Sequence, residues 1–218
     1  MKTFTCIGFA GVLALAAGSA HAQEFQVTGG QTNVLLDVAT LSAAASLNLS
    51  SVSADVIAPG GLGEGSVAFG INSTSASSLP TTFAYDSGLT GFAGTIEHTG
   101  SVFFNDNTVE VGNFTIGFDA GRVGDNRSGF FVESTTGIAA ILFDVQAPSA
   151  VIADSSQLSI EANLLVSSEF ASFLSSNGLA SSDLTGADVG DALVSAVPAP
   201  GSVALLGACG LLASRRRR

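Results

Sequence analysis

The sequence predicts an all-β fold, mainly antiparallel, arranged as a sandwich or partly closed barrel with one or two short helices. Short runs rich in Val, Ile and Phe recur along the chain, and Gly, Ser, Thr and Asn separate them. Apolar and polar residues alternate within the clearest runs, which is typical of half-buried strands. No internal repeat of fixed period is evident, so we expect a single packed β domain.

The clearest strand covers residues 109–118. Apolar residues alternate at 109 and 111 and again at 114, 116 and 118. The Gly112-Asn113 pair shifts the phase between the two halves, which predicts a bulge or tight turn. Ser101–Phe104 and Thr108–Val111 flank Asn105-Asp106-Asn107, whose residue types tolerate left-handed turns. The pattern therefore predicts a β-hairpin at this point.

Similar runs predict the remaining strands. The run at 157–165 places Leu158, Ile160, Ala162 and Leu164 on one face, as a strand with one buried side requires. The other expected strands cover Phe25–Thr28, Val52–Ile57, Ser66–Ile71, Phe92–His98, Gly129–Glu133 and Ile138–Val145.

Two segments have a helical pattern instead. In Ser168–Asn177, apolar residues Phe170, Phe173 and Leu174 fall at i, i+3 and i+4, and a glycine follows the last turn. The alanine-rich segment Leu36–Leu47 is the second candidate. Each helix would bury its apolar face, and the simplest way is to cover an open end or face of the β structure.

The first 22 residues have the organisation of a secretory signal peptide. Lys2 supplies a positive charge, and Ile7–Ala17 form an apolar stretch rich in Ala, Gly and Leu. Ala20 and Ala22 then give a small-x-small cleavage site before Gln23. We expect the Sec translocon to export the chain and signal peptidase to cut it there.

The last 22 residues combine three parts in a fixed order. An apolar run covers Gly201–Ala213, and as a helix it would reach roughly 20 Å across a hydrocarbon core of roughly 30 Å. Prolines interrupt helical structure before it, and terminal arginines would hold its far end on the cytoplasmic face. The motif before the run is Val197, Pro198, Ala199 and Pro200, and the basic tail is Arg215, Arg216, Arg217 and Arg218.

In its parts and their order, this segment resembles the PEP-CTERM sorting signal. In that family a Pro-Glu-Pro-like motif, a hydrophobic helix and a basic tail are recognised by an exosortase in exopolysaccharide-producing bacteria. Ala199 stands where the family usually has Glu. The resemblance covers residues 197–218. It implies transient anchoring in the inner membrane, processing by an exosortase-type protease, and delivery to the cell surface or extracellular matrix, with exopolysaccharide as a candidate partner.

Between the two signals, residues 23–196 form one predicted β-rich exported domain that is large enough to bury a core. Both cysteines, Cys6 and Cys209, lie in the signals, so this domain has no thiol and no disulfide. It keeps two basic residues, Arg122 and Arg127, against all 18 acidic residues, which gives a net charge of −16. A surface this acidic argues against nucleic acid as a partner.

The domain contains few residues suited to catalysis. Its one histidine is His98, and no Gly-x-Ser-x-Gly elbow accompanies it, so a polar strand position is expected rather than a catalytic base. One histidine without a thiol does not make a standard structural zinc site. Carboxylate pairs for glycoside hydrolysis remain an alternative, although spacing selects none of them. We expect no cofactor and no enzymatic activity.

Two glycine-rich segments contain several oxygen ligands. Asp119–Gly129 holds both domain arginines and two aspartates, and Asp183–Asp191 holds three aspartates. Either could offer oxygens to calcium, but the EF-hand spacing is absent. Inter-strand loops, the first carrying Arg–Asp pairs, are the expected structures. The sequence thus predicts a secreted protein with a structural or adhesive role, and a calcium- or polysaccharide-binding module is the alternative.

Overall fold

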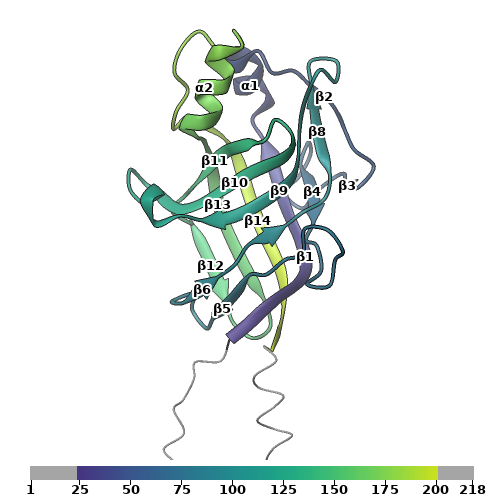
Figure 1. The fold of residues 1–218 in the computed structure, drawn as a ribbon, viewed down its shortest axis with the longest axis vertical. Coiled ribbons are helices and arrows are strands. Elements are labelled where there is room, and N and C mark those ends of the chain that lie inside the picture. Colours follow the sequence, from purple (N-terminus) through teal and green to yellow (C-terminus); the bar gives the residue numbers. More distant parts are fainter. Residues whose placement is uncertain (1–23, 201–218) are drawn as a thin grey trace, which may run out of the picture.

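The computed structural model describes residues 24–200, which fold into a barrel-like antiparallel sheet with two short helices at one end (Figure 1). The predicted fold class is therefore confirmed. Neither of these helices is long and apolar enough to cross a membrane.

The fourteen strands and the helical elements of this region follow in chain order. They are β1 (Glu24–Leu36), α1 (Val38–Ala45), β2 (Leu49–Val52), β3 (Val56–Ile57), β4 (Val67–Gly70), β5 (Ala84–Asp86), β6 (Phe92–Ala93), β7 (Ile96–Glu97), β8 (Ser101–Phe104), β9 (Val109–Phe118), the 3₁₀ turn η1 (Ala120–Arg122), β10 (Arg127–Gly137), β11 (Ala140–Gln146), β12 (Ala150–Ala153), β13 (Leu158–Val166), α2 (Ser168–Ser176) and β14 (Asp188–Pro200).

The sheet runs in the order β2-β8-β9-β10-β11-β13-β14-β1-β4-β3, and every pairing in it is antiparallel. It curves back on itself because the end of β4 meets the end of β7. An isolated bridge joins Ile71 to His98, and the amide of Asn72 donates to the carbonyl of Glu97 at 2.8 Å. Since β7 also pairs with β9, the two halves of the sheet enclose a common interior.

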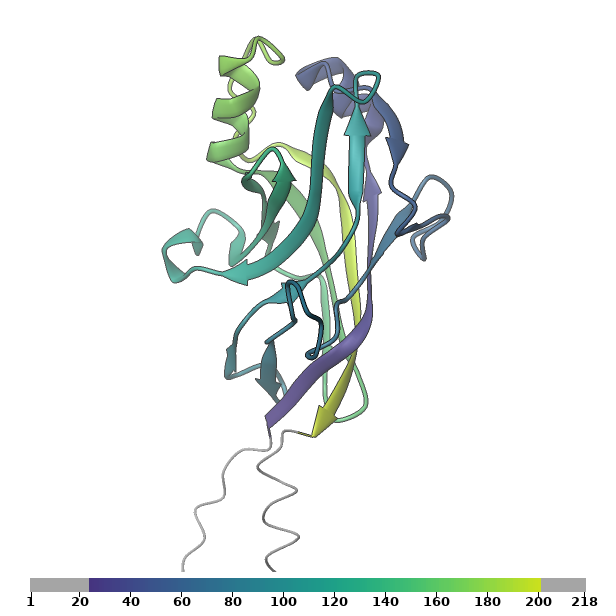
Figure 2. The same ribbon diagram turned by 45° about the vertical axis from the view of Figure 1, so that its right-hand side comes forward.

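The long strands β1 and β14 form the spine of the barrel and lie side by side over its whole length (Figure 2). Their register runs from Phe25 opposite Pro200 to Leu36 opposite Gly190, with one irregularity between Val27 and Gly29. As the strands are antiparallel, β1 begins and β14 ends at the same end of the barrel. The two helices lie at the opposite end (Figure 1).

Both helices begin at side chains that accept hydrogen bonds from their first free amides. Asp37 accepts from the amides of Ala39 and Thr40 before α1, and Ser167 accepts from the amide of Phe170 before α2. Leu174 of α2 is completely buried, which stabilises the docked helix by about 2 kcal/mol. The helices therefore close one end of the barrel with apolar side chains, as the sequence pattern predicts.

The core consists of two clusters of buried side chains. The helix-end cluster gathers around Leu41, Phe104, Leu142 and Leu174. The terminus-end cluster contains, at its centre, Phe25, Val27, Phe83, Tyr85 and Leu158.

The sequence predicted the most regular elements well. Asn105, Asp106 and Asn107 have φ values of 54°, 56° and 64°, so the hairpin between β8 and β9 turns through left-handed residues as expected. Asn113 has a φ of 48°, and the inward face of β9 changes there from Val111 to Phe114, so the predicted phase shift is confirmed.

Other predictions need correction. The expected strand Phe92–His98 is divided into β6 and β7, and Val52–Ile57 is divided between β2 and β3. The expected loop Asp183–Asp191 is wrong in its second half, because β14 begins at Asp188. Pairing with β1 and β13 supplies the backbone hydrogen bonds that make this Asp- and Gly-containing segment a strand.

Candidate functional site

The predicted sorting motif forms the end of β14. Pro198 lies opposite Val27, Ala199 opposite Gln26 and Pro200 opposite Phe25, so β14 continues beyond the domain boundary predicted at residue 196. The hydroxyl of Thr28 also donates to the carbonyl of Val197 at 3.1 Å.

This end of β14 has a strand on one side only, because its pairing with β13 stops at Ala196. Prolines lack the amide that a second neighbour would require, so they suit a strand with one free edge. Val197 is 56% exposed. The motif is thus accessible from one edge and paired to β1 along the other. The remaining predicted processing residues, Ala20, Ala22, Gln23 and Arg215–Arg218, lie outside the described residues.

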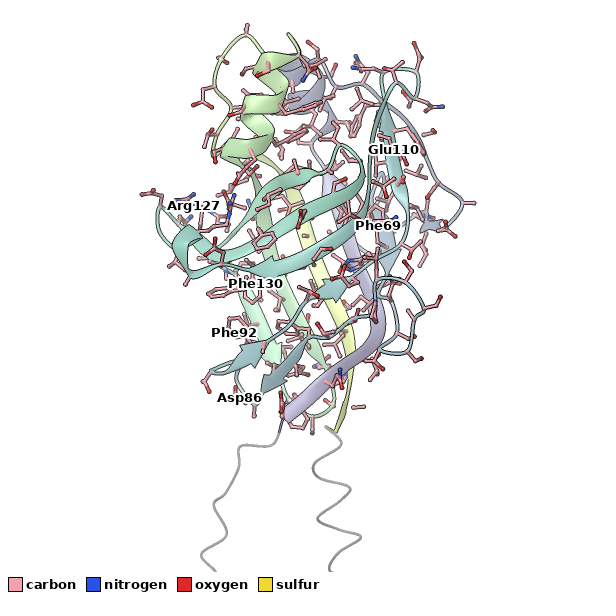
Figure 3. The ribbon with its side chains drawn as sticks, in the orientation of Figure 1. Phe69, Asp86, Phe92, Glu110, Arg127 and Phe130 are labelled. Atoms are coloured by element: carbon pink, nitrogen blue, oxygen red, sulfur yellow. The ribbon has the colours of Figure 1, made fainter. Side chains whose placement is uncertain are left out.

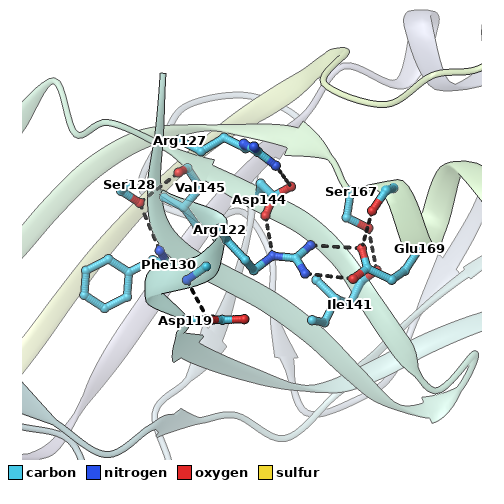
Figure 4. Close-up of polar contacts among 12 residues, drawn as sticks. Asp119, Arg122, Arg127, Ser128, Phe130, Ile141, Asp144, Val145, Ser167 and Glu169 are labelled. Atoms are coloured by element: carbon cyan, nitrogen blue, oxygen red, sulfur yellow. Dashed lines mark hydrogen bonds and ion pairs between the residues drawn. The ribbon is translucent and has the colours of Figure 1, made fainter. Parts of the chain in front are cut away.

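The second sequence candidate, the loop with both domain arginines, is organised by an ion-pair network (Figure 4). Arg122 in η1 donates through Nε to Asp144 Oδ1 at 2.7 Å, and through Nη1 and Nη2 to the two carboxylate oxygens of Glu169 at 2.7 and 2.9 Å. The guanidinium also lies over the ring of Phe131, 5.9 Å from its centroid. It therefore ties η1 to β11 and to the first turn of α2.

Arg127 completes the network more loosely. Its Nη1 lies 3.6 Å from Asp144 Oδ2, and its Nη2 lies 3.5 Å from Asp125 Oδ2. The hydrogen bonds from Arg122 lower the pKa of Glu169 to about 2, and those to Glu169 and Asp144 raise the pKa of Arg122. The guanidinium of Arg122 is paired with the carboxylates of both Glu169 and Asp144, so the network is suited to holding loops together rather than to proton transfer.

Three of the aspartates that were considered for calcium make local hydrogen bonds instead. Asp119 accepts from the amide of Gly121 at 2.8 Å, Asp183 accepts from the amide of Thr185, and Asp188 accepts from the side chain of Asn163. Within residues 24–200, no group of three or more His, Cys, Asp or Glu side chains is arranged to hold a metal ion.

His98 lies inside the barrel and is only 1% exposed. Its Nδ1 lies 3.0 Å from the carbonyl oxygen of Phe114, which can only accept, so Nδ1 carries the proton. Its Nε2 then accepts from the hydroxyl of Thr32 at 2.8 Å. Burial lowers the pKa of His98 to about 4, although the Phe114 carbonyl and the charge of Glu97 act in the opposite direction. The ring is neutral at pH 7 and joins β1 to β9 across the interior.

Beside this pair the barrel encloses a cavity of about 100 Å³. Its walls combine residues of both core clusters, including Leu41, Leu142 and Phe170 near the helices and Phe83 and Ile160 toward the chain ends. The lining is almost entirely apolar, and the polar side chains in it are Thr32 and His98.

An aromatic cluster lies between this cavity and the surface. It consists of Phe92 on β6, Phe118 on β9 and Phe130 on β10, with ring centroids 4.9 to 5.3 Å apart. Phe130 also lines the cavity, whereas Phe118 is 40% exposed. Phe92 and Phe130 lie on the same side of the molecule (Figure 3). We call these three residues the aromatic mouth.

Sequence reasoning did not identify the aromatic mouth. The chain has 15 phenylalanines, one tyrosine and no tryptophan, so an unusual dependence on Phe was a visible signal. Phe118 and Phe130 lie opposite each other in the consecutive strands β9 and β10. Nothing in the spacing indicates that Phe92 joins them, because β6 pairs with neither strand and its ring meets the other two through packing.

Comparison with known proteins supports the fold alone. No protein-family model matches the chain, and no curated protein matches it. Among solved structures, the chain is similar to the C-terminal domain of HtaA from Corynebacterium glutamicum, with 17% sequence identity and a TM-score of 0.50. The similarity covers 80% of this chain and 99% of that domain, so the two share a β architecture across almost the whole of the HtaA domain.

Proposed function

We propose that the chain is an exported domain, sorted by an exosortase-type protease to the cell surface or extracellular matrix, with a structural or adhesive role and no catalytic activity. The observation that carries this proposal is the pairing of β1 with β14, which puts both ends of the domain at one end of the barrel. A domain tethered by its tail would stand with this end toward the membrane. The helix end and its loops would then point outward.

The sorting steps follow from the order of the parts. The Sec translocon exports the chain, signal peptidase cuts after Ala22, and the apolar run Gly201–Ala213 halts in the inner membrane with Arg215–Arg218 on the cytoplasmic side. The motif lies directly at the end of the last strand, with no intervening linker. An exosortase therefore has to act close to the folded barrel.

The chemistry of the described residues supports a role without catalysis. Both nitrogens of His98 are engaged in hydrogen bonds, and a base with a pKa of about 4 in a nearly inaccessible place is poorly suited to accept a substrate proton at neutral pH. The most buried carboxylate of the ion-pair network, Asp144, is neutralised by Arg122. An anionic exopolysaccharide would be repelled unless cations bridge it to the domain, because the domain carries a net charge of −16.

The test is the intact mass and cellular fraction of the protein from its native cells, compared with the Pro198→Ala/Pro200→Ala variant. We expect the native chain to be released or surface-bound with its C-terminus trimmed near residue 198. We expect the variant to keep its full tail in the inner membrane. Pro80→Ala/Pro148→Ala is the matched control, since these prolines lie in loops outside the motif. If all three proteins retain Arg218 in the membrane, the tail is a plain anchor and the proposal is wrong.

A further inference from the structure

The cavity in the barrel could hold several water molecules by its volume but offers almost nothing to bind them. Its volume of about 100 Å³ far exceeds the roughly 10–15 Å³ that one water molecule needs. A buried water also needs two to four polar partners. The two polar side chains in the wall, Thr32 and His98, bond to each other, and no buried side-chain nitrogen or oxygen of the described residues lacks a partner. The cavity is therefore suited to an apolar guest.

The aromatic mouth offers a route into this cavity because the sheet is not continuous at that side. In the described sheet, β6, which carries Phe92, pairs with β5 alone. No ladder therefore joins β6 to β9 or β10, the strands of Phe118 and Phe130. Side chains fill the remaining space, and rings can rotate aside at far lower cost than a hydrogen-bonded strand can separate.

The structure also limits what can bind inside. A charged or strongly polar molecule would lose its hydration and find little to replace it, because Thr32 and His98 already bond to each other and only the Thr32 hydroxyl oxygen can accept a further hydrogen bond. An apolar molecule would instead replace empty space with contacts to side chains, and apolar lining of this kind is typical of small-molecule sites in barrels. The cavity is comparable in size to an apolar cavity of about 150 Å³ that binds benzene.

We propose that the barrel interior binds a small, uncharged hydrocarbon, of about the size of benzene, which enters between Phe92 and Phe118. Selectivity comes from exclusion, because a polar analogue of the same size finds at most the Thr32 hydroxyl oxygen as a hydrogen-bond acceptor in the wall. This inference does not depend on how the chain is sorted.

The experiment titrates the full-length chain, held in amphipol, with benzene and follows side-chain methyl signals by NMR. The methyl groups of Leu142 and Val194 report on the interior, and those of Val151 and Ile152 report on the exposed surface of β12. We expect saturable shifts at the interior methyl groups and none at the surface ones. Phenol, whose hydroxyl would have to give up its hydration, should produce weaker interior shifts than benzene at the same concentration.

Cavity-filling variants make the test specific. Ala162→Leu places three extra carbons in the cavity wall and should abolish the saturable shifts, and Ala150→Leu on the exposed face of β12 is the matched control that should retain them. If Ala162→Leu does not fold, Ala192→Val fills the same cavity from β14 by a smaller step. Phe118→Ala should retain binding but speed exchange of the guest, because it widens the mouth.

Two outcomes would overturn the proposal. One is the absence of saturable interior shifts in the unaltered chain. The other is equal binding by the unaltered chain and by a folded cavity-filling variant, since the guest would then lie elsewhere.

Discussion

At the scale of single residues, His98 makes stability depend on pH. The unfolded chain titrates at the ordinary histidine pKa of about 6.5, and burial lowers the folded pKa to about 4. Between these values the unfolded chain binds more protons, so the free energy of unfolding falls as the pH falls. We expect a loss of about 2 kcal/mol between pH 7 and pH 5 from this group.

Urea denaturation at several pH values checks this expectation. The range between pH 7 and pH 5 is chosen because most carboxylates titrate below it. His98→Gln keeps polar groups at the site but removes the imidazole that titrates in this range. The free energy of unfolding of this variant should therefore change much less between pH 7 and pH 5. Equal slopes in the two proteins would mean that His98 is not the titrating group.

The two arginines of the ion-pair network should differ in their effect on stability. Arg122→Ala leaves buried Asp144 with only its longer contact to Arg127 and removes both hydrogen bonds to Glu169, so we expect a loss on the order of 3 kcal/mol. Arg127→Ala removes weaker, more exposed contacts and should cost about 1 kcal/mol. Chemical denaturation of both variants measures the difference. Equal losses would show that the network does not depend on Arg122.

At the scale of elements, α2 depends on the N-cap residue that precedes it, Ser167. Ser167 is fully buried, donates to the carbonyl of Ile141 at 2.6 Å and accepts from the amide of Phe170 at 3.0 Å. Ser167→Ala removes both bonds and should destabilise the fold by about 1–2 kcal/mol. Ser168→Ala, at the exposed neighbouring position, is the control and should lie within about 0.5 kcal/mol of the parent. Thermal unfolding of the two variants measures the difference, and equal stability of both would contradict the prediction.

The sequence predicts elements best where one local signal is enough. Helix α2 has apolar residues at helical spacing, and the β8–β9 turn has three consecutive residues that tolerate positive φ. Strand β14 has no such signal at its start, because Asp188 and Gly190 favour a loop locally and only the partners β1 and β13 make them a strand. The short strand β5 depends in the same way on β1 and β6.

The ion-pair network could be predicted from the sequence only in part. The sequence indicated that the two arginines of the Asp119–Gly129 segment would form ion pairs, and the pair between Arg127 and Asp125 is within that segment. The stronger partners of Arg122 are Asp144 on β11 and Glu169 on α2. No spacing rule connects positions so far apart, because the distance between them is set by how the sheet curves and where the helix docks.

At the scale of the whole molecule, the sequence predicts the charge of the surface better than the packing of the interior. The net negative charge of the domain follows from its composition. The cavity, in contrast, is lined by single side chains from many strands and both helices, and each of these side chains alone is an ordinary core residue. Its existence depends on the diameter of the barrel and on the side chains that fill it. Hydropathy patterns indicate which side chains point inward, and they do not indicate whether those side chains fill the space.

The pairing of the predicted sorting motif with β1 gives a final prediction about the intact molecule. A protease that cuts an extended segment has to reach its backbone, and residues 197–200 are paired along one edge with residues between Phe25 and Gly29. Trimming then requires the last residues of β14 to separate from β1, which local fraying of a terminal strand permits at a limited rate. A short Gly-Ser insertion between Ala196 and Val197 would carry the motif away from β1. We expect it to speed trimming in native cells.

Pulse-chase labelling with intact-mass readout measures the rate at which the tail is lost. The same insertion in the exposed loop at 181–183 is the control, because it lengthens the chain without moving the motif. Faster trimming in the first variant alone would mean that strand pairing limits access to the motif. Unchanged trimming in both would mean that the protease acts on the strand as it stands, from its exposed edge at Val197. That result would be compatible with the proposed sorting route, but it would contradict the prediction that pairing with β1 limits the rate of trimming.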